Sequence, residues 1–155
     1  MILSKNFTLN EFTKSVTAIR NNIDNSPSSE HIRNIQLLVK YVLQPLRDAL
    51  GKPIRITSGY RSENLNKIIK GSKKSSHMKG QAADLQFKVD GVMKNKDIWD
   101  KVIELGLPFD QMINEFDYSW IHISYNHEYN RKSLLEAYKE SGKTKYKYHT
   151  IEKGL

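Results

Sequence analysis

The sequence contains no cysteine, and this absence removes several classes of protein. Without thiols the chain has no disulfide framework, no cysteine-based zinc finger, no iron–sulfur cluster and no thiol nucleophile. It also has no apolar run approaching the roughly 18–20 residues that cross a bilayer, so we expect no membrane span. If the protein binds a transition metal, the ligands must therefore be histidine and carboxylate side chains.

Proline and glycine are scarce, with four and eight residues among 155, and the chain shows no internal repeat or low-complexity tract. A chain of this length that is 38% hydrophobic is long enough for one core and short for two. We therefore expect a single domain over residues 1–155, and a monomer. The first residues lack the apolar stretch of a signal peptide, which predicts cytoplasmic synthesis without an export signal of its own.

The hydrophobic pattern predicts helices first and a mixture of helices and strands later. Helices are expected over residues 8–22 (from the Thr8/Glu11 capping box), 28–50 (kinked at Pro45, ended by Gly51), 62–69 and 95–105. Strands are expected over residues 54–58, 82–87, 111–115 and 120–124. This order favours an α+β fold, with helices packed on a small, mostly antiparallel sheet. Residues 136–155 form either a basic C-terminal tail or an edge strand.

The positive charge is concentrated at the C-terminal end. Residues 131–155 carry seven basic and three acidic side chains, which is half of the net charge of +8. Such a segment attracts polyanions of several kinds: nucleic acid, anionic lipid or the anionic polymers of a bacterial envelope. The chain has no recognisable element for reading nucleic acid, so we expect no specific nucleic-acid partner.

Three side chains have the chemistry of a catalytic zinc site. His77 follows a polar loop, Asp84 opens an apolar strand, and His122 alternates with isoleucines in Trp120–Ser124. Two histidines and one aspartate, with a fourth position open for water, form a sound ligand set for catalytic zinc. Taken singly, each residue has an ordinary explanation as a packed histidine or a turn partner.

A zinc hydrolase also needs a carboxylate that takes a proton from water and passes it to the leaving amine. Glu115 is the preferred candidate because it precedes the predicted strand of His122 and can fold back beside it. Asp117 is the alternative. A glutamate considered by itself, as Glu115 is here, is more often a solvated charge than a general base.

The combined motifs resemble those of zinc D-Ala-D-Ala carboxypeptidases and related wall-lytic peptidases. The resemblance rests on Ser75-x-His77-x-x-Gly80-x-Ala82-x-Asp84, on Trp120-x-His122-x-Ser124, on Ile54–Ser62 with its arginine, on Gly71-Ser72 and on Phe109–Glu115. It covers roughly residues 5–135. It implies a hedgehog/DD-peptidase-like fold, Zn²⁺ held by His77, Asp84 and His122, and zinc-bound water as nucleophile.

The same resemblance assigns further roles around the metal. Glu115 takes the place of the catalytic carboxylate, and Arg61 that of the arginine that binds substrate or steadies the oxyanion. A structural ion pair is the other explanation for Arg61. Ser75 is expected to support the His77 loop by a side-chain hydrogen bond, on the substrate side of the site. Trp120 walls the site or packs in the core.

The chain departs from some relatives at one position. Where they carry the catalytic glutamate three residues before the last histidine, this sequence has Ser119. Two hypotheses follow: a zinc metallopeptidase acting on peptidoglycan stem peptides, or a zinc-containing binding module of the same fold that has lost catalysis. The enzyme would be a D,D-carboxypeptidase or a lytic endopeptidase. It is encoded either by the host or by a phage, and a phage enzyme would act on the wall after release or from the virion. His127 is expected at the surface, and His31 and His149 have no assigned function.

Overall fold

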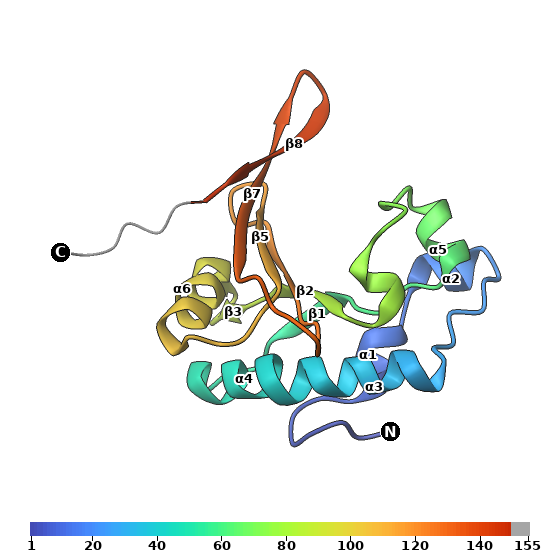
Figure 1. Cartoon of the computed structure of the whole chain (residues 1–155), viewed down its shortest axis with the longest axis horizontal. Coiled ribbons are helices and arrows are strands. Elements are labelled where there is room, and N and C mark those ends of the chain that lie inside the picture. The colour runs from blue at the N-terminus through green and yellow to red at the C-terminus, as the bar shows by residue number, and fades with distance from the viewer. Residues whose placement is uncertain (150–155) are drawn as a thin grey trace.

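A six-stranded sheet organises the computed structural model, which describes residues 1–149 (Figure 1). Its strand order is β1-β2-β6-β5-β7-β8, and a separate ribbon pairs β3 with β4. The strands are β1 (Arg55–Ser58), β2 (Ala82–Gln86), β3 (Lys88–Val89), β4 (Val92–Met93), β5 (Gln111–Glu115), β6 (Trp120–Ser124), β7 (Ser133–Glu140) and β8 (Lys143–Tyr148). Within the large sheet every neighbouring pair is antiparallel except β5 and β7, so the predicted α+β class is confirmed.

The helices precede the sheet or connect its strands. They are α1 (Leu9–Thr13), α2 (Val16–Arg20), α3 (Ser29–Leu38), the π segment η1 (Val39–Leu43), α4 (Gln44–Leu50), α5 (Glu63–Ile68), the 3₁₀ turn η2 (Ser76–Lys79) and α6 (Asn95–Leu105). In residues 1–149, none of them has the length and apolar character needed to cross a membrane.

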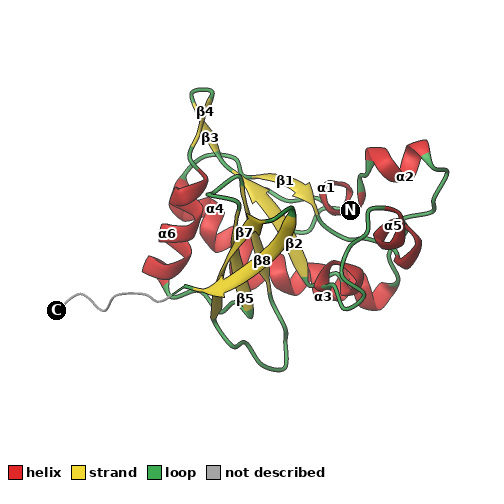
Figure 2. Cartoon of the chain, turned by 90° about the horizontal axis from the view of Figure 1, so that it is seen from above, coloured by secondary structure: helices red, strands yellow, loops and turns green. Residues whose placement is uncertain are grey.

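The sheet has one apolar face and one polar face. On one face of β2, β6 and β5 the buried side chains are mainly apolar, namely Ala83, Leu85, Ile121, Ile123 and Met112, whereas on the other face polar side chains lie among the buried Ala82 and Ile113. These residues share one core with α3, η1, α4 and α6, and Figure 2 shows the strands lying over α3 and α4. The opposite face carries Asp84, His122 and Glu115, so chemistry and core are on opposite sides of the same strands.

The long predicted helix is present, and its proline is accommodated without a break. Pro45 has no N–H to donate, and the turn immediately before it widens into η1, where the Gln44 N–H bonds to the Val39 carbonyl. The irregularity expected at Pro45 therefore takes the form of a π segment. Gly51 ends the helix in the left-handed conformation, with φ of 72°.

The predicted helix over residues 8–22 is wrong in its continuity, because α1 and α2 are separate helices. The Phe12 carbonyl accepts a hydrogen bond from Tyr60 N at 2.6 Å, and the Thr13 carbonyl accepts one from the Asn25 side chain at 2.9 Å. Both carbonyls are therefore bonded to residues outside the helix. Ser15 then begins a new helix, since its hydroxyl accepts from Ala18 N at 3.1 Å.

The C-terminal segment forms a hairpin. Residues 143–148 form the edge strand β8, and residues 133–140 form β7, whose last five residues belong to the segment expected to be a tail or an edge strand. Ser141 and Gly142 turn the chain with φ of 52° and 75°, as a two-residue hairpin loop requires. The end of the predicted tail, residues 150–155, lies outside the described residues.

Gly80 is constrained both by its backbone and by its surroundings, because it has φ of 73° and a Cβ there would lie 2.5 Å from the His31 carbonyl oxygen of α3. Gly106 has a similar φ of 62° but open space around it. We predict that Gly106→Ala costs about 1 kcal/mol of unfolding free energy and Gly80→Ala about 3 kcal/mol or more. Urea unfolding of both variants is the measurement, and equal losses would contradict the close approach to α3.

Candidate metal centre

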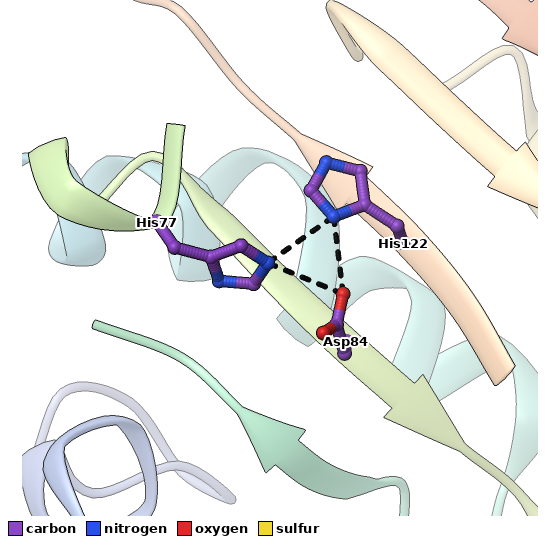
Figure 3. Close-up of side chains that lie close together, drawn as sticks. All are labelled: His77, Asp84 and His122. Atoms are coloured by element: carbon purple, nitrogen blue, oxygen red, sulfur yellow. Dashed lines mark hydrogen bonds and ion pairs between the residues drawn. The ribbon is translucent and has the colours of Figure 1, made fainter. Parts of the chain in front are cut away.

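Three donor atoms from different elements converge on the polar face of the sheet (Figure 3). His77 Nε2 lies 3.2 Å from Asp84 Oδ1, His122 Nδ1 lies 3.0 Å from the same oxygen, and the two imidazole nitrogens are 3.2 Å apart. Within residues 1–149 this is the one group of three histidine or acidic side chains that is close enough to hold a metal ion.

Strand register places two of these residues. Asp84 on β2 and His122 on β6 are direct partners in an antiparallel pair, so both side chains project from the same face. His77 arrives from the connection before β2. The Ser75 hydroxyl accepts a hydrogen bond from His77 N at 3.2 Å at the start of η2, and Gly80 turns the chain into β2.

The geometry fits a tetrahedral zinc ion. Ligand atoms about 2.0–2.1 Å from such an ion stand about 3.3 Å apart, close to the separations found here. His77 Nδ1 lies 2.7 Å from the Gly59 carbonyl oxygen and donates to it, which leaves the Nε2 lone pair free for the metal. With His77 2% and Asp84 8% exposed, the ligand set is held in place by its surroundings.

Electrostatics favour the protonation states that a metal requires. Burial lowers the pKa of His77, so its imidazole is neutral near pH 7. Burial would raise the pKa of Asp84, but its interactions with the two imidazoles outweigh burial and hold that pKa well below its usual range. A neutral imidazole and an ionised carboxylate are the forms that bind Zn²⁺.

Arg61 borders the metal centre on the β1 side. Its Nη2 lies 3.4 Å from Asp84 Oδ2, the carboxylate oxygen that faces away from the histidines, and its Nε donates to Ser58 Oγ at 3.1 Å. Its backbone N–H bonds to the His77 carbonyl at 3.1 Å, so the arginine loop and the His77 loop are joined. Burial lowers the pKa of the guanidinium, partly offset by Asp84 and Glu115. Arg61 thus forms an ion pair with Asp84 while it borders the candidate site.

Glu115 lies on the same face as the ligands. It is at the end of β5, opposite Trp120, and its neighbour two residues earlier, Ile113, is opposite His122. The side chain makes no hydrogen bond or ion pair with any residue among 1–149, although Glu115 is only 9% exposed. Burial raises its pKa to about 7, with Asp84 adding to the rise and His122 and Arg61 opposing it. A carboxylate with this pKa is suited to accept and return a proton near neutral pH.

Asp117 and Ser119 lie in the turn that joins β5 to β6, and both are exposed. Three consecutive residues, 116–118, have positive φ. The Asn114 side chain accepts from Tyr118 N at 2.6 Å and anchors this turn, and the hydroxyl of Ser119 donates to the Phe116 carbonyl. The turn brings Glu115 back beside β6, so the longer spacing between Glu115 and His122 is closed by a hairpin.

The other residues singled out from the sequence occupy varied places. The Trp120 ring packs on Phe116, with ring centres 5.5 Å apart. His127 is at the surface beside Glu128, as expected. His31 caps α3 together with Ser28, and His149 packs on Trp99, so both have structural contacts.

Two contributors to the site escaped the sequence analysis. The Gly59 carbonyl orients His77, and the Ser58 hydroxyl holds Arg61. A carbonyl carries no signal in residue type. Ser58 and Gly59 do precede Arg61 within the strand-and-arginine motif, and that position is the signal that could have identified them.

Comparison with known proteins agrees with this geometry. Residues 5–124 match the family model described as Peptidase M15. Over 50 residues, 32% of this chain, the sequence is 44% identical to the zinc D-Ala-D-Ala carboxypeptidase of Streptomyces albus G, and the aligned part spans 20% of that protein. The family match contains all three donor residues together with Arg61 and Glu115. The chain belongs to the peptidase M15 family.

Proposed function

We propose that the protein is a zinc metallopeptidase that hydrolyses peptide bonds in the stem peptide of peptidoglycan. The observation that carries this proposal is the nearly buried Glu115, which has no hydrogen bond or ion pair within residues 1–149. It lies on the same sheet face as three donor atoms whose separations suit zinc. The name of the Streptomyces albus G relative, a zinc D-Ala-D-Ala carboxypeptidase, supports the substrate class.

His77, Asp84 and His122 would hold the metal, and the remaining residues handle protons and substrate. A zinc ion bound there supplies a Lewis acid that activates water near neutral pH. Glu115 accepts the proton of the attacking water and delivers it to the leaving amine, a role that its pKa of about 7 supports. Arg61, whose side chain is 15% exposed, presents a planar cation to a substrate carboxylate or to the developing oxyanion.

The reaction type within this class is either D,D-carboxypeptidase or lytic endopeptidase of the endolysin kind. A carboxypeptidase cleaves the bond before a C-terminal residue, whose α-carboxylate is free, whereas an endopeptidase cleaves a bond inside a longer peptide. Both reactions would use the same groups on the enzyme. The wall is the proposed place of action, where the lysines of β8 support retention on anionic envelope polymers.

A binding module without turnover is the second candidate, and Ser119 is the observation that favours it. Such a module would still bind a metal ion through His77, Asp84 and His122, but Glu115 would have no catalytic role. Products from purified peptidoglycan decide between the two candidates.

Removal of the metal is expected to abolish hydrolysis. We predict about one zinc per chain, and at least about a 100-fold loss of muropeptide cleavage after chelation or in His122→Ala, because water activation is lost. Metal analysis and mass spectrometry of muropeptide digests measure both effects. His127→Ala, at the exposed histidine, should retain zinc and activity. Cleavage that survives chelation would contradict the mechanism.

Glu115→Gln keeps the shape of the side chain and removes the base. We predict normal zinc content and a fall in kcat of about 10²–10⁴-fold, the usual contribution of a general base. Asp117→Asn, in the exposed turn, should retain wild-type kcat. Zinc retention with no product from the wild-type protein would support the binding module, and loss of activity in Asp117→Asn alone would make Asp117 the base.

Glu115 also predicts a pH dependence of stability in the metal-free protein. The unfolded chain loses this proton near pH 4.5, whereas the folded state keeps it to about pH 7. The free energy of unfolding therefore falls as pH rises through that window, by about 2–3 kcal/mol. Glu115→Gln should be more stable than the wild type at pH 8 by that amount and equal to it at pH 4. Urea unfolding in chelator measures this, and no gain at pH 8 would contradict the burial of the charge.

A further inference from the structure

The hairpin β7–β8 lies beyond the family match and extends the sheet on the Glu115 side. Glu115 pairs with Ala137 of β7, and Ala137 pairs with Tyr146 of β8. With Trp120 on β6, these residues form one row across four neighbouring strands. Direct partners in a sheet project to the same face, so Tyr146 shares the face of Glu115 and the metal ligands.

Ala137 makes a contact between Glu115 and Tyr146 feasible. Glu115 and Tyr146 are two strands apart, or about 10 Å between Cα atoms, and only a methyl group stands between them. Both side chains are long enough to meet over a methyl. Burial, and next the Glu115 carboxylate, raise the pKa of the Tyr146 phenol, which agrees with their closeness. Tyr146 is nevertheless 55% exposed, so its hydroxyl is accessible from solvent.

One lysine of the hairpin also faces the site. Lys139 follows Ala137 by two residues, so it projects to the same face. Its ammonium lies 5.4 Å from the centre of the Phe116 ring and donates to Thr144 Oγ1 at 2.8 Å. Phe116 follows Glu115 directly and packs on Trp120. The cation is therefore held above an aromatic pair at the border of the site.

Two of the other three lysines of the hairpin differ from Lys139 in both direction and pairing, and the third, Lys143, differs in direction. Lys145 and Lys147 project to the opposite face, where they pair with Glu140 at 3.2 Å and Glu136 at 3.6 Å. Lys139 has no acidic partner among residues 1–149. A positioned cation without a counterion next to a peptidase site is suited to a carboxylate of the substrate.

We propose that the β7–β8 hairpin is a substrate-binding wall, in which Tyr146 donates a hydrogen bond to the bound peptide beside Glu115 and Lys139 pairs with a peptide carboxylate. The ligand class is an acidic peptide that carries a carboxylate a few residues from the cleaved bond, because Lys139 is two residue rows from the His122 row, about 14 Å along the strands. The assignment rests on the proposed peptidase function.

The test uses a stem pentapeptide in three forms: with all carboxylates free, with the internal glutamate carboxyl amidated, and with the C-terminus amidated. For the free form, Lys139→Gln should raise KM about tenfold and leave kcat within twofold, and Tyr146→Phe should lower kcat/KM about tenfold. The effect of Lys139→Gln should disappear with one amidated form, which identifies the carboxylate. Lys145→Gln, on the opposite face, is the matched control and should match the wild type.

Binding separates this inference from the peptidase proposal. Anisotropy of the labelled free pentapeptide is measured on zinc-loaded Glu115→Gln protein, with and without Lys139→Gln. About tenfold weaker binding in the double variant supports the wall even if the wild type releases no product, an outcome that would overturn only the peptidase function. Equal binding, an equal loss for every peptide form, or an equal loss in Lys145→Gln would overturn the wall.

Discussion

The site depends on the antiparallel register in which Asp84 of β2 lies opposite His122 of β6. Alternate residues of these strands belong to the core, so a slip of one residue would turn both ligands into the apolar side and expose the isoleucines. The hydrophobic effect that fixes the core therefore also fixes two of the three side chains that could hold a metal ion. Only His77 needs separate support, which the Gly59 carbonyl and the tight fit of Gly80 against α3 provide.

The sequence predicts the elements best where local and tertiary preferences agree. Residues 95–105, 111–115 and 120–124 form the expected helix and strands with the expected bounds. The first helix is interrupted because Tyr60 and Asn25, distant in sequence, compete for the carbonyls of Phe12 and Thr13. The start of β7 at Ser133 and its place inside the sheet were not predicted, because β7 pairs in parallel with β5 and no local turn connects the two strands.

For the candidate site too, the features that depend on local sequence could be predicted and those that depend on tertiary contacts could not. Residue types at characteristic spacing indicate His77, Asp84 and His122, and the structure brings these three together. The burial of Glu115 could not be predicted, because it depends on a turn of three residues with positive φ that Asn114 anchors. The row from Trp120 to Tyr146 could not be predicted either. Ala137 contributes to it only by being small, and an alanine in a sequence gives no sign of such a role.

The edge position of β8 has a consequence for solubility. An edge strand offers unpaired backbone groups on which a strand of another molecule can build. In β8 every second residue from Lys143 to Lys147 is a lysine, so a second copy adding there would bring like charges side by side. The positive charge that first suggested a polyanionic partner thus also protects the open side of the sheet from aggregation.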